Sequence, residues 1–318
     1  LYARFNSEFN YMPAELGLSI LKVLAYFDLF DYPVSKEELF SFLERPVDME
    51  AFSEALTALQ ESKHLFLIRG FYTLHNNEWL IDRRIKGNLR ARSLLQTAKG
   101  ISRFLYQIPY VRAIGISGSL SKNFAAEDAD IDYFIITRSN RLWVARTMMH
   151  FVKKLNYLLG RQHWYCMNYY IDMEALEIEE KNIFTAIELI TLLPVQGAET
   201  LREFCRRNEW ATEFYPNYKE KICPEAALNG NNLLKRILEY LLNGRIGDWL
   251  DNYFMRVTSG RWKRKEALQK RSVKGTRMSL FAGKHFSKPN PAYFQREILG
   301  LYHDKLSKQK QAWTRHFV

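Results

Sequence analysis

The fold of this chain is decided by Val111-Arg-Ala-Ile-Gly-Ile-Ser-Gly-Ser119 and, ten residues later, by Asp130-Ile-Asp-Tyr-Phe-Ile-Ile-Thr137. Both stretches are rich in β-branched and aromatic residues, which predicts two strands. The first strand ends on Gly118-Ser119, a pair that favours a tight turn. In the second strand Asp130 and Asp132 share one face, because successive side chains of a strand point to opposite sides. The stretch therefore supplies a turn and two carboxylates that converge.

Together, the turn and the carboxylates predict a site for phosphate and divalent metal. Two carboxylates about 6–7 Å apart on a strand repel each other, and Mg²⁺ bound together with substrate phosphates would relieve that repulsion. Glycine lets backbone amides approach an anion closely, and Leu120-Ser-Lys-Asn-Phe124 predicts a short helical turn whose N-terminus could face a phosphate. An isolated Asp-x-Asp pair is commonly the solvated edge of a strand, so the interpretation as a site depends on the neighbouring turn.

The order strand, Gly-Ser, short helix and strand with Asp-x-Asp resembles the polymerase-β-like nucleotidyltransferase superfamily. The resemblance implies a small mixed sheet backed by helices, with Asp130 and Asp132 holding Mg²⁺ or Mn²⁺. It also implies that Gly118 and Ser119 hold the triphosphate of a nucleoside triphosphate donor. Many members carry an arginine three residues after the serine. Here Lys122 stands in its place and is assigned to nucleotide binding; it keeps the positive charge and loses the bidentate geometry.

The superfamily usually adds a third carboxylate on a later strand, but the candidate strand here, His163 to Ile171, carries Asn168. Asparagine can ligate Mg²⁺ through its carbonyl oxygen, yet it brings no charge and is a poor general base. Asp172 lies four residues further on and therefore on the same face as Asn168. Asp172 either joins Asp130 and Asp132 as a catalytic residue or caps the next turn. A third interpretation is a site that binds nucleotide without turnover, with Asn168 as a nucleotide contact.

The composition is that of an ordinary soluble globular chain, with 318 residues, 47% apolar and 25% charged, enough for two or three domains. No stretch reaches eighteen apolar residues and the start does not resemble a signal peptide, so we expect a cytoplasmic protein without a membrane partner. The first residue is Leu1 and not methionine, which weakens the argument about targeting. Cys166, Cys205 and Cys223 lack metal-ligand spacing and are expected to be packing residues.

Residues 1–76 predict three helices and a hairpin. The helices run from Ala14 to Phe30, from a capping box at Ser35-Lys-Glu-Glu38, and from Asp48 to Ser62, and the hairpin turns at Arg69-Gly70. This order resembles a winged helix-turn-helix domain. Its third helix carries four acidic residues and no Lys or Arg, which would repel DNA phosphate, so we expect a protein partner there. Residues 77–109 follow as one long basic helix that Pro109 ends.

Residues 110–218 are expected to form the catalytic core. Arg141 to Leu159 and Asn182 to Leu193 have helical apolar spacing and are expected to cover the sheet. Glu188, on the second of these helices, could be a buried acid of the site. A solvated or salt-bridged glutamate is the commoner case, so it is not assigned to the site.

Residues 219–318 are predicted to be mainly helical and carry most of the charge. Between Arg256 and Lys288 there are eleven basic residues and one acid, which is +10 of the net charge of +11. Glycines and aromatic residues interrupt this run, which favours a loop over a phosphate or a stacked base. The residues assigned to anion binding are Arg261, Lys263, Arg264, Lys274 and Arg277. Folded against the aspartates they would neutralise the triphosphate or an acidic acceptor, and pointing away they would hold nucleic acid.

These features together predict an α+β fold, with a small mixed β-sheet nucleotidyltransferase core and helices, flanked by an N-terminal winged helix and a C-terminal helical domain. The predicted activity is Mg²⁺-dependent transfer of a nucleoside monophosphate from a nucleoside triphosphate to an unidentified acceptor hydroxyl, with release of pyrophosphate. The acceptor is expected to be acidic or phosphorylated, with nucleic acid among the candidates. The alternative is a catalytically degenerate transferase fold that binds nucleotide or nucleic acid.

Overall fold

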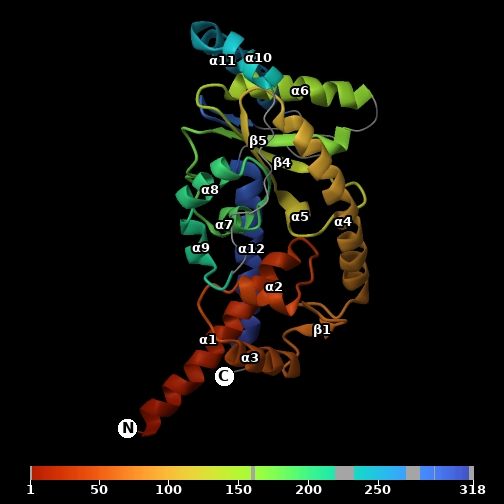
Figure 1. Ribbon diagram of the computed structural model, residues 1–318. Coiled ribbons are helices and arrows are strands. Elements are labelled where there is room, and N and C mark those ends of the chain that lie inside the picture. The colour runs from red at the N-terminus through yellow and green to blue at the C-terminus, as the bar shows by residue number, and fades with distance from the viewer. Residues whose placement is uncertain (1, 159–161, 219–232, 270–279, 290, 315–318) are drawn as a thin grey trace. The chain divides into compact units, whose positions relative to one another are not determined.

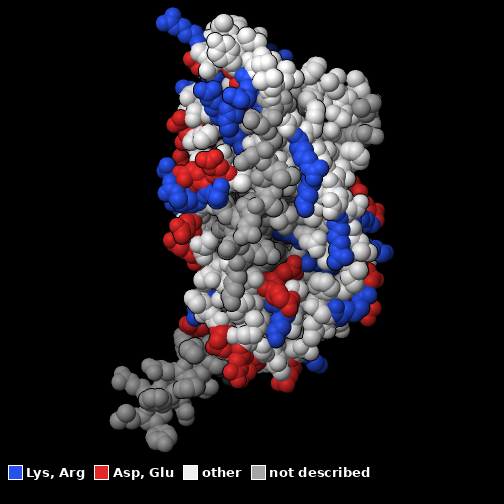
Figure 2. Space-filling view, viewed as in Figure 1, with Lys and Arg blue, Asp and Glu red and all other residues white. Residues whose placement is uncertain are grey.

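The computed structural model describes residues 2–158, 162–218, 233–269, 280–289 and 291–314 and has a mixed α+β fold (Figure 1). The chain divides into two compact units. The first comprises residues 1–86, 210–220 and 295–318, and the second comprises 87–209 and 221–294. Lys and Arg are distributed over the face that Figure 2 shows, in both units. In the part of the chain that the structure describes, no helix is both long and apolar enough to cross a membrane.

The first unit begins with three helices and a hairpin, the order that the sequence predicts. The helices are α1 (Tyr2–Asp28), α2 (Lys36–Ser41) and α3 (Met49–Glu61), and the hairpin strands are β1 (Phe66–Ile68) and β2 (Phe71–Thr73). The predicted capping box is present, since the Ser35 hydroxyl accepts from the Glu38 N–H and the Glu38 carboxylate accepts from the Ser35 N–H. Gly70, with φ +85°, occupies the left-handed region that the hairpin turn requires.

Two further elements complete the first unit. The short helix α9 (Trp210–Phe214) and most of the last helix, α12 (Pro291–Thr314), belong to it. Tyr302 of α12 contacts Tyr26 of α1 with ring centroids 6.1 Å apart. The predicted boundary at residue 219 therefore differs from the observed one, because the end of the chain packs with the beginning.

The long helix α4 (Glu78–Tyr106) follows the hairpin and ends shortly before Pro109, as the sequence predicts. It contributes residues to both units. Ala91, Ala98 and Leu105 of α4 are fully buried in the core of the second unit, which is why the helix does not behave as a solvated linker.

A six-stranded mixed sheet with the strand order β6-β3-β4-β5-β8-β7 forms the second unit. The strands are β3 (Val111–Ile116), β4 (Asp132–Thr137), β5 (Cys166–Asp172), β6 (Leu193–Gln196), β7 (Leu280–Ala282) and β8 (Phe286–Pro289). Only β4 and β5 pair in parallel among these neighbours. Helix α6 (Leu142–Leu158) makes the crossover between them, as a parallel pair requires.

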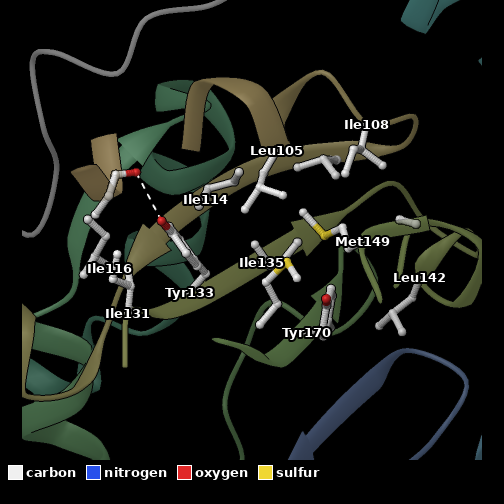
Figure 3. Packing of buried hydrophobic residues seen from close by; sticks show 14 of the residues in the cluster. Leu105, Ile108, Ile114, Ile116, Ile131, Tyr133, Ile135, Leu142, Met149 and Tyr170 are labelled. Atoms are coloured by element: carbon white, nitrogen blue, oxygen red, sulfur yellow. Dashed lines mark hydrogen bonds between the residues drawn. The ribbon is translucent and has the colours of Figure 1, made fainter. Parts of the chain in front are cut away.

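Helices α4 and α6 cover one face of this sheet. Alternate residues of the central strands, among them Ile114, Tyr133 and Ile135, point to this face and are fully buried with Met149 of α6 (Figure 3). The Tyr133 hydroxyl donates to the carbonyl oxygen of Ala98 in α4 over 3.3 Å. This apolar cluster is the main core of the second unit.

Helices α7 (Ile183–Ile190) and α8 (Ala198–Arg207) lie on the other face. Phe134 of β4 packs there against Phe204 of α8, with ring centroids 4.9 Å apart. Asp132 is two residues before Phe134 and therefore points to the same face. The carboxylate of the Asp-x-Asp motif is thus directed toward α7 and α8 and away from the main core.

The region after residue 219 does not form a separate basic helical domain. Helices α10 (Leu233–Leu241) and α11 (Gly244–Ala267) belong to the second unit, and the hairpin β7–β8 joins its sheet beside β5. Phe281, Phe286 and Lys288, which the sequence suggests for a loop over phosphate, lie in this hairpin. The Lys288 ammonium is buried and pairs with Glu180 at 2.5 Å, so it is a structural cation of the sheet edge.

Candidate functional site

The turn after β3 brings Gly118 against the first residue of β4. The Ser117 N–H donates to the carbonyl oxygen of Asp132 over 2.9 Å, which continues the pairing of the two strands. Gly118 has φ +70° and begins the short helix α5 (Gly118–Ser121). A Cβ placed on Gly118 would lie 2.7 Å from Oδ2 of Asp132. The backbone conformation therefore favours glycine at this position, and a side chain here would displace the Asp132 carboxylate.

The two aspartates flank Ile131, whose side chain is fully buried in the main core. Asp132, the first residue of β4, consequently projects from the opposite side of the strand, and Asp130 lies just before the strand begins. Oδ1 of Asp130 lies 2.7 Å from Nδ1 of His163, and both side chains are partly exposed. His163 was not assigned to the site from the sequence, since it lies more than thirty residues away along the chain and only strand pairing brings it close.

Cys166 begins β5 and stands opposite Asp132 in the parallel pair. Burial raises the pKa of its thiol to about 12, and the negative charges of Asp132 and Asp130, together with the hydrogen bond to Asp132, act in the same direction. The thiol is therefore protonated at neutral pH and donates to the carboxylate. Cys166 is buried, as expected for a packing residue, and it also contacts the candidate site.

Glu188 of α7 engages the groups that the sequence assigns to phosphate. Its Oε2 accepts from the N–H of Gly118 over 3.2 Å, and its Oε1 lies 2.7 Å from Nζ of Lys122. Nζ of Lys122 also donates to the carbonyl oxygen of Gly118 over 3.1 Å. Glu188 is salt-bridged, which is the commoner case for a glutamate. The sequence does not predict that its partner is Lys122 of the candidate site. The turn therefore holds an anionic group, and that group is a carboxylate of this chain.

Hydrogen bonds from backbone N–H groups and from hydroxyl groups complete the turn. Ser119 is exposed, and its carbonyl oxygen accepts from the N–H groups of Lys122 and Phe124 over 3.0 and 3.1 Å. The Ser121 hydroxyl donates to the carbonyl oxygen of Gly118 over 2.8 Å and lies 3.5 Å from the hydroxyl of Thr191. These bonds fix α5 against the end of α7, so the Gly118 amide keeps its direction.

The structure does not bring Asp172 to Asp130 and Asp132, with which the sequence grouped it as a catalytic residue. The parallel register pairs Asp132 with Cys166 and Thr137 with Asp172, so Asp172 lies about 16 Å further along the sheet. The Asp172 side chain is fully buried and accepts from the N–H groups of Asn140 and Glu174 over 2.8 and 2.9 Å. It caps a turn, which is the second alternative that the sequence allows. The sequence alone does not show that β5 runs parallel to β4, and this direction separates the two aspartates.

Three other assigned residues lie outside the described part of the chain in whole or in part. Asn168 is in β5, but its side chain is not among the described residues. Lys274 and Arg277 fall between residues 270 and 279, which are likewise outside the description. Their assignments stay predictions.

Arg261, Lys263 and Arg264 are exposed on α11, which packs against α6. Asp251 of α11 accepts from the N–H groups of Trp143 and Val144 at the start of α6, over 2.8 and 3.0 Å. Helix α6 covers the face of the sheet opposite to Asp132. These three cations therefore lie on a helix that packs over the face of the sheet opposite to Asp132, and their assignment to anion binding stays a prediction.

The donor set suits a hard divalent cation. Asp130 and Asp132 offer carboxylate oxygens, the ligands that Mg²⁺ and Mn²⁺ prefer, at a turn where glycine leaves space for a bound group. In the ranges that the structure describes, no cluster of three or more His, Cys, Asp or Glu side chains is arranged to hold a metal ion.

Comparison with known proteins gives no relative for this chain, since no protein-family model, curated protein or solved structure matches it. The account of function therefore depends on the geometry of the residues themselves.

Proposed function

We propose that the chain is a Mg²⁺-dependent nucleotidyltransferase of the polymerase-β-like type. The observation that carries the proposal is the proximity of Gly118 and Asp132: Gly118 has a left-handed backbone, and a Cβ on it would lie 2.7 Å from Oδ2 of Asp132, the first residue of β4. A turn that holds phosphate and a carboxylate that holds a phosphate-bound metal have to be neighbours in such an enzyme. Their proximity across thirteen intervening residues supports the resemblance of the motif.

The groups on the turn would receive the triphosphate. The Gly118 N–H and the Lys122 ammonium both bind oxygens of the Glu188 carboxylate, so they already converge on an anion. A terminal phosphate of the donor would take the place of this carboxylate, and the backbone amide and the lysine would then neutralise part of its charge.

The aspartates would hold the metal. Asp130 and Asp132 would contribute carboxylate oxygens to Mg²⁺ or Mn²⁺. When bound, the cation would neutralise and orient the triphosphate of the donor. Cys166 is buried beside Asp132. Its bond to Asp132 would hold that carboxylate in one orientation.

In the proposed reaction the oxygen of an acceptor hydroxyl attacks the α-phosphorus of the nucleoside triphosphate. The bond from the α-phosphorus to the oxygen that bridges to the β-phosphate breaks, and pyrophosphate leaves with that oxygen. The hydroxyl proton passes to a neighbouring carboxylate or to water. Most of the rate would come from positioning and charge neutralisation by the turn and the aspartates.

A second candidate is a catalytically degenerate protein of the same fold that binds nucleotide. Two observations favour it: Asp172 is remote from Asp132, and Glu188 occupies the Gly118 amide. In that case the turn would still bind phosphate, but no transfer would follow.

The first unit supports a protein partner in this proposal. It has the helix and hairpin order of a winged helix, and the exposed side of α3 carries Glu50, Glu54 and Glu61. Carboxylates at this position would repel a nucleic acid backbone. A basic protein surface fits it better.

The proposal is tested by thermal unfolding with ATP, GTP, CTP and UTP in turn, each with and without Mg²⁺. A ligand at a hundred times its dissociation constant stabilises a fold by about 2.7 kcal/mol, which shifts the midpoint measurably. We expect a Mg²⁺-dependent shift for at least one nucleotide, and we expect the Asp130→Asn, Asp132→Asn double variant to lose it.

The matched control is Asp128→Asn, which makes the same chemical change on an exposed residue of the same loop. It should keep the shift. A shift that is independent of Mg²⁺ and of the aspartates would favour the binding protein, and the absence of a shift with every nucleotide would contradict both candidates.

A further inference from the structure

Two charged residues of helix α10, Lys235 and Glu239, point inward. Lys235 is buried, and its Nζ donates to the carbonyl oxygens of Tyr106 and Val111, both over 2.7 Å. Glu239, one turn later, accepts from the N–H of Tyr110 over 2.7 Å and pairs with Arg112 at 2.7 Å. The face that a surface helix usually presents to water is therefore used here for internal hydrogen bonds.

The opposite face of α10 is apolar and exposed. Leu233, Ile237, Tyr240 and Leu241 recur at helical spacing, and their side chains are between 46% and 81% exposed. A surface helix of a globular protein ordinarily has the reverse arrangement, with its apolar stripe against the core. An apolar stripe directed to solvent marks a surface that is covered by something else.

Helix α11 continues this surface. Trp249 and Tyr253 are exposed and stack on each other, with ring centroids 5.5 Å apart and planes 11° apart. Ile246, one turn before Trp249, is exposed as well. Figure 2 shows a largely uncharged surface over α10 and α11 at the top of the view, with Lys and Arg beside it. We call these seven residues of α10 and α11 the α10–α11 surface.

The charge around the α10–α11 surface is positive. Arg236, Arg245 and Arg256 are exposed, and none of them forms an ion pair within the residues that the structure describes. Three of the four acids on these helices are engaged within the second unit, since Glu239 pairs with Arg112, Asp248 pairs with Arg141, and Asp251 accepts from two backbone amides of α6. Further along α11, Arg261, Lys263 and Arg264 extend the positive charge.

We propose that the α10–α11 surface binds an anionic lipid bilayer, lying on it without crossing it. Aliphatic side chains would enter the boundary between headgroups and acyl chains, Trp249 and Tyr253 would lie at headgroup level, and the arginines would pair with lipid phosphates and carboxylates. This peripheral contact goes beyond the proposed activity, and it differs from the expectation of no membrane partner, which rested on the lack of an apolar span.

Charge and side-chain type favour lipid over the other occupants. A second copy docked through the same surface would bring arginines against arginines in both partners, which is unfavourable. A nucleic acid would satisfy the arginines and stack on Trp249, but it would leave Leu233, Ile237 and Leu241 in water. Of these three occupants, the anionic bilayer is the one that covers the apolar and the basic residues together.

The test is co-sedimentation of the full chain with phosphatidylcholine vesicles that contain or lack phosphatidylserine. The apolar variant is Ile237→Gln, Tyr240→Gln, Leu241→Gln, and the charge variant is Arg236→Gln, Arg245→Gln, Arg256→Gln. The control, Leu89→Gln, removes a comparably exposed leucine from α4 of the same unit. Because all these side chains are exposed, the variants should keep the thermal midpoint of the wild type.

We expect the wild type to bind vesicles with phosphatidylserine more tightly, and more weakly as salt rises. The apolar variant should lose at least about tenfold in affinity, the charge variant about fivefold for each arginine removed, and the control nothing. The proposal is overturned if the wild type binds neither vesicle, or if both variants bind like the control. It is also overturned if both variants abolish binding of single-stranded RNA or self-association while vesicle binding persists.

Discussion

The two ends of the β4–β5 pair carry carboxylates that behave in opposite ways. At the amino end, Asp130 and Asp132 are partly exposed and meet a glycine turn, a histidine and a thiol. At the carboxyl end, Asp172 is fully buried and accepts three hydrogen bonds from groups of its own chain, including Nδ1 of His285 at 2.9 Å. Asp251 is likewise buried there against the first amides of α6.

The difference shows how the same residue type becomes structural or functional. A carboxylate whose oxygens are already occupied by backbone amides has no capacity left for a ligand, and its removal would orphan buried N–H groups. A carboxylate that faces a glycine and solvent keeps capacity for a cation. The comparison predicts that changes at the carboxyl end act on stability and changes at the amino end act on ligand binding.

The largest expected effect on stability is that of Asp172→Ala. It leaves the N–H groups of Asn140 and Glu174 without their acceptor in a buried turn, which should lower the free energy of unfolding by about 2–4 kcal/mol. Urea denaturation measures the loss. Glu127→Ala, which removes an exposed ion pair with Arg90, is the control and should cost under about 1 kcal/mol. If Asp172→Ala folds with unchanged stability but loses nucleotide binding, the contrast between the two ends is wrong.

At the carboxyl end of the β4–β5 pair, the titration of Asp251 should make the free energy of unfolding depend on pH. Burial raises the pKa of Asp251 from 3.8 to about 6, so between these values the folded state holds a proton that the unfolded chain releases. The contribution of Asp251 is fully present below about pH 4 and is lost as the pH rises to about 6, by roughly 3 kcal/mol.

Asp251→Asn keeps the oxygen that accepts both amides and removes the titration. Its stability relative to wild type should therefore rise between pH 4 and pH 7 in urea unfolding. Parallel curves for the two proteins would show that this carboxylate does not titrate in the folded range.

A smaller loss of stability is expected for Gly118→Ala at the amino end. A residue with a side chain at φ +70° costs about 1–2 kcal/mol, and its Cβ would press on the Asp132 carboxylate. We expect loss of the nucleotide-dependent thermal shift together with this modest destabilisation. Gly70→Ala, also at positive φ but with open space around its Cβ, is the matched control and should keep the shift.

The smallest expected effect is a gain of affinity in Glu188→Gln. The neutral amide competes less well than the carboxylate for the Gly118 N–H and the Lys122 ammonium. The dissociation constant for inorganic triphosphate should therefore fall by a few-fold, as measured by calorimetry. Weaker binding would indicate that Glu188 assists the ligand instead of competing with it. Glu180→Gln, which changes a carboxylate paired with Lys288, should leave the affinity unchanged.

Local patterns made the central features of this fold predictable. The alternating pattern around Ile131 predicts that Ile131 is buried. The Gly118-Ser119 pair predicts the turn after β3, and the capping box at Ser35 predicts the start of α2. Each depends on neighbours within a few residues, and the energies that decide them are local.

The features that were missed depend on partners far along the chain. Because β5 runs parallel to β4, Asp172 lies at the end of β5 that is remote from Asp132. Tertiary packing brings Glu188 to the Gly118 amide. The strands β7 and β8 are only three and four residues long, too short for an alternating pattern to distinguish them from a loop. Their identity comes from pairing with β5, which no single stretch of sequence contains.

The central claim, that the carboxylates at the amino end of β4 serve transfer chemistry, is tested most directly by pyrophosphate release from each nucleoside triphosphate with Mg²⁺. The wild type would be compared with Asp132→Asn and with Asp128→Asn in the presence of candidate acceptors with free hydroxyls. The account predicts release by the wild type and the Asp128 variant, and a loss of at least about a hundredfold in Asp132→Asn with its fold intact. Equal release by wild type and Asp132→Asn would contradict it.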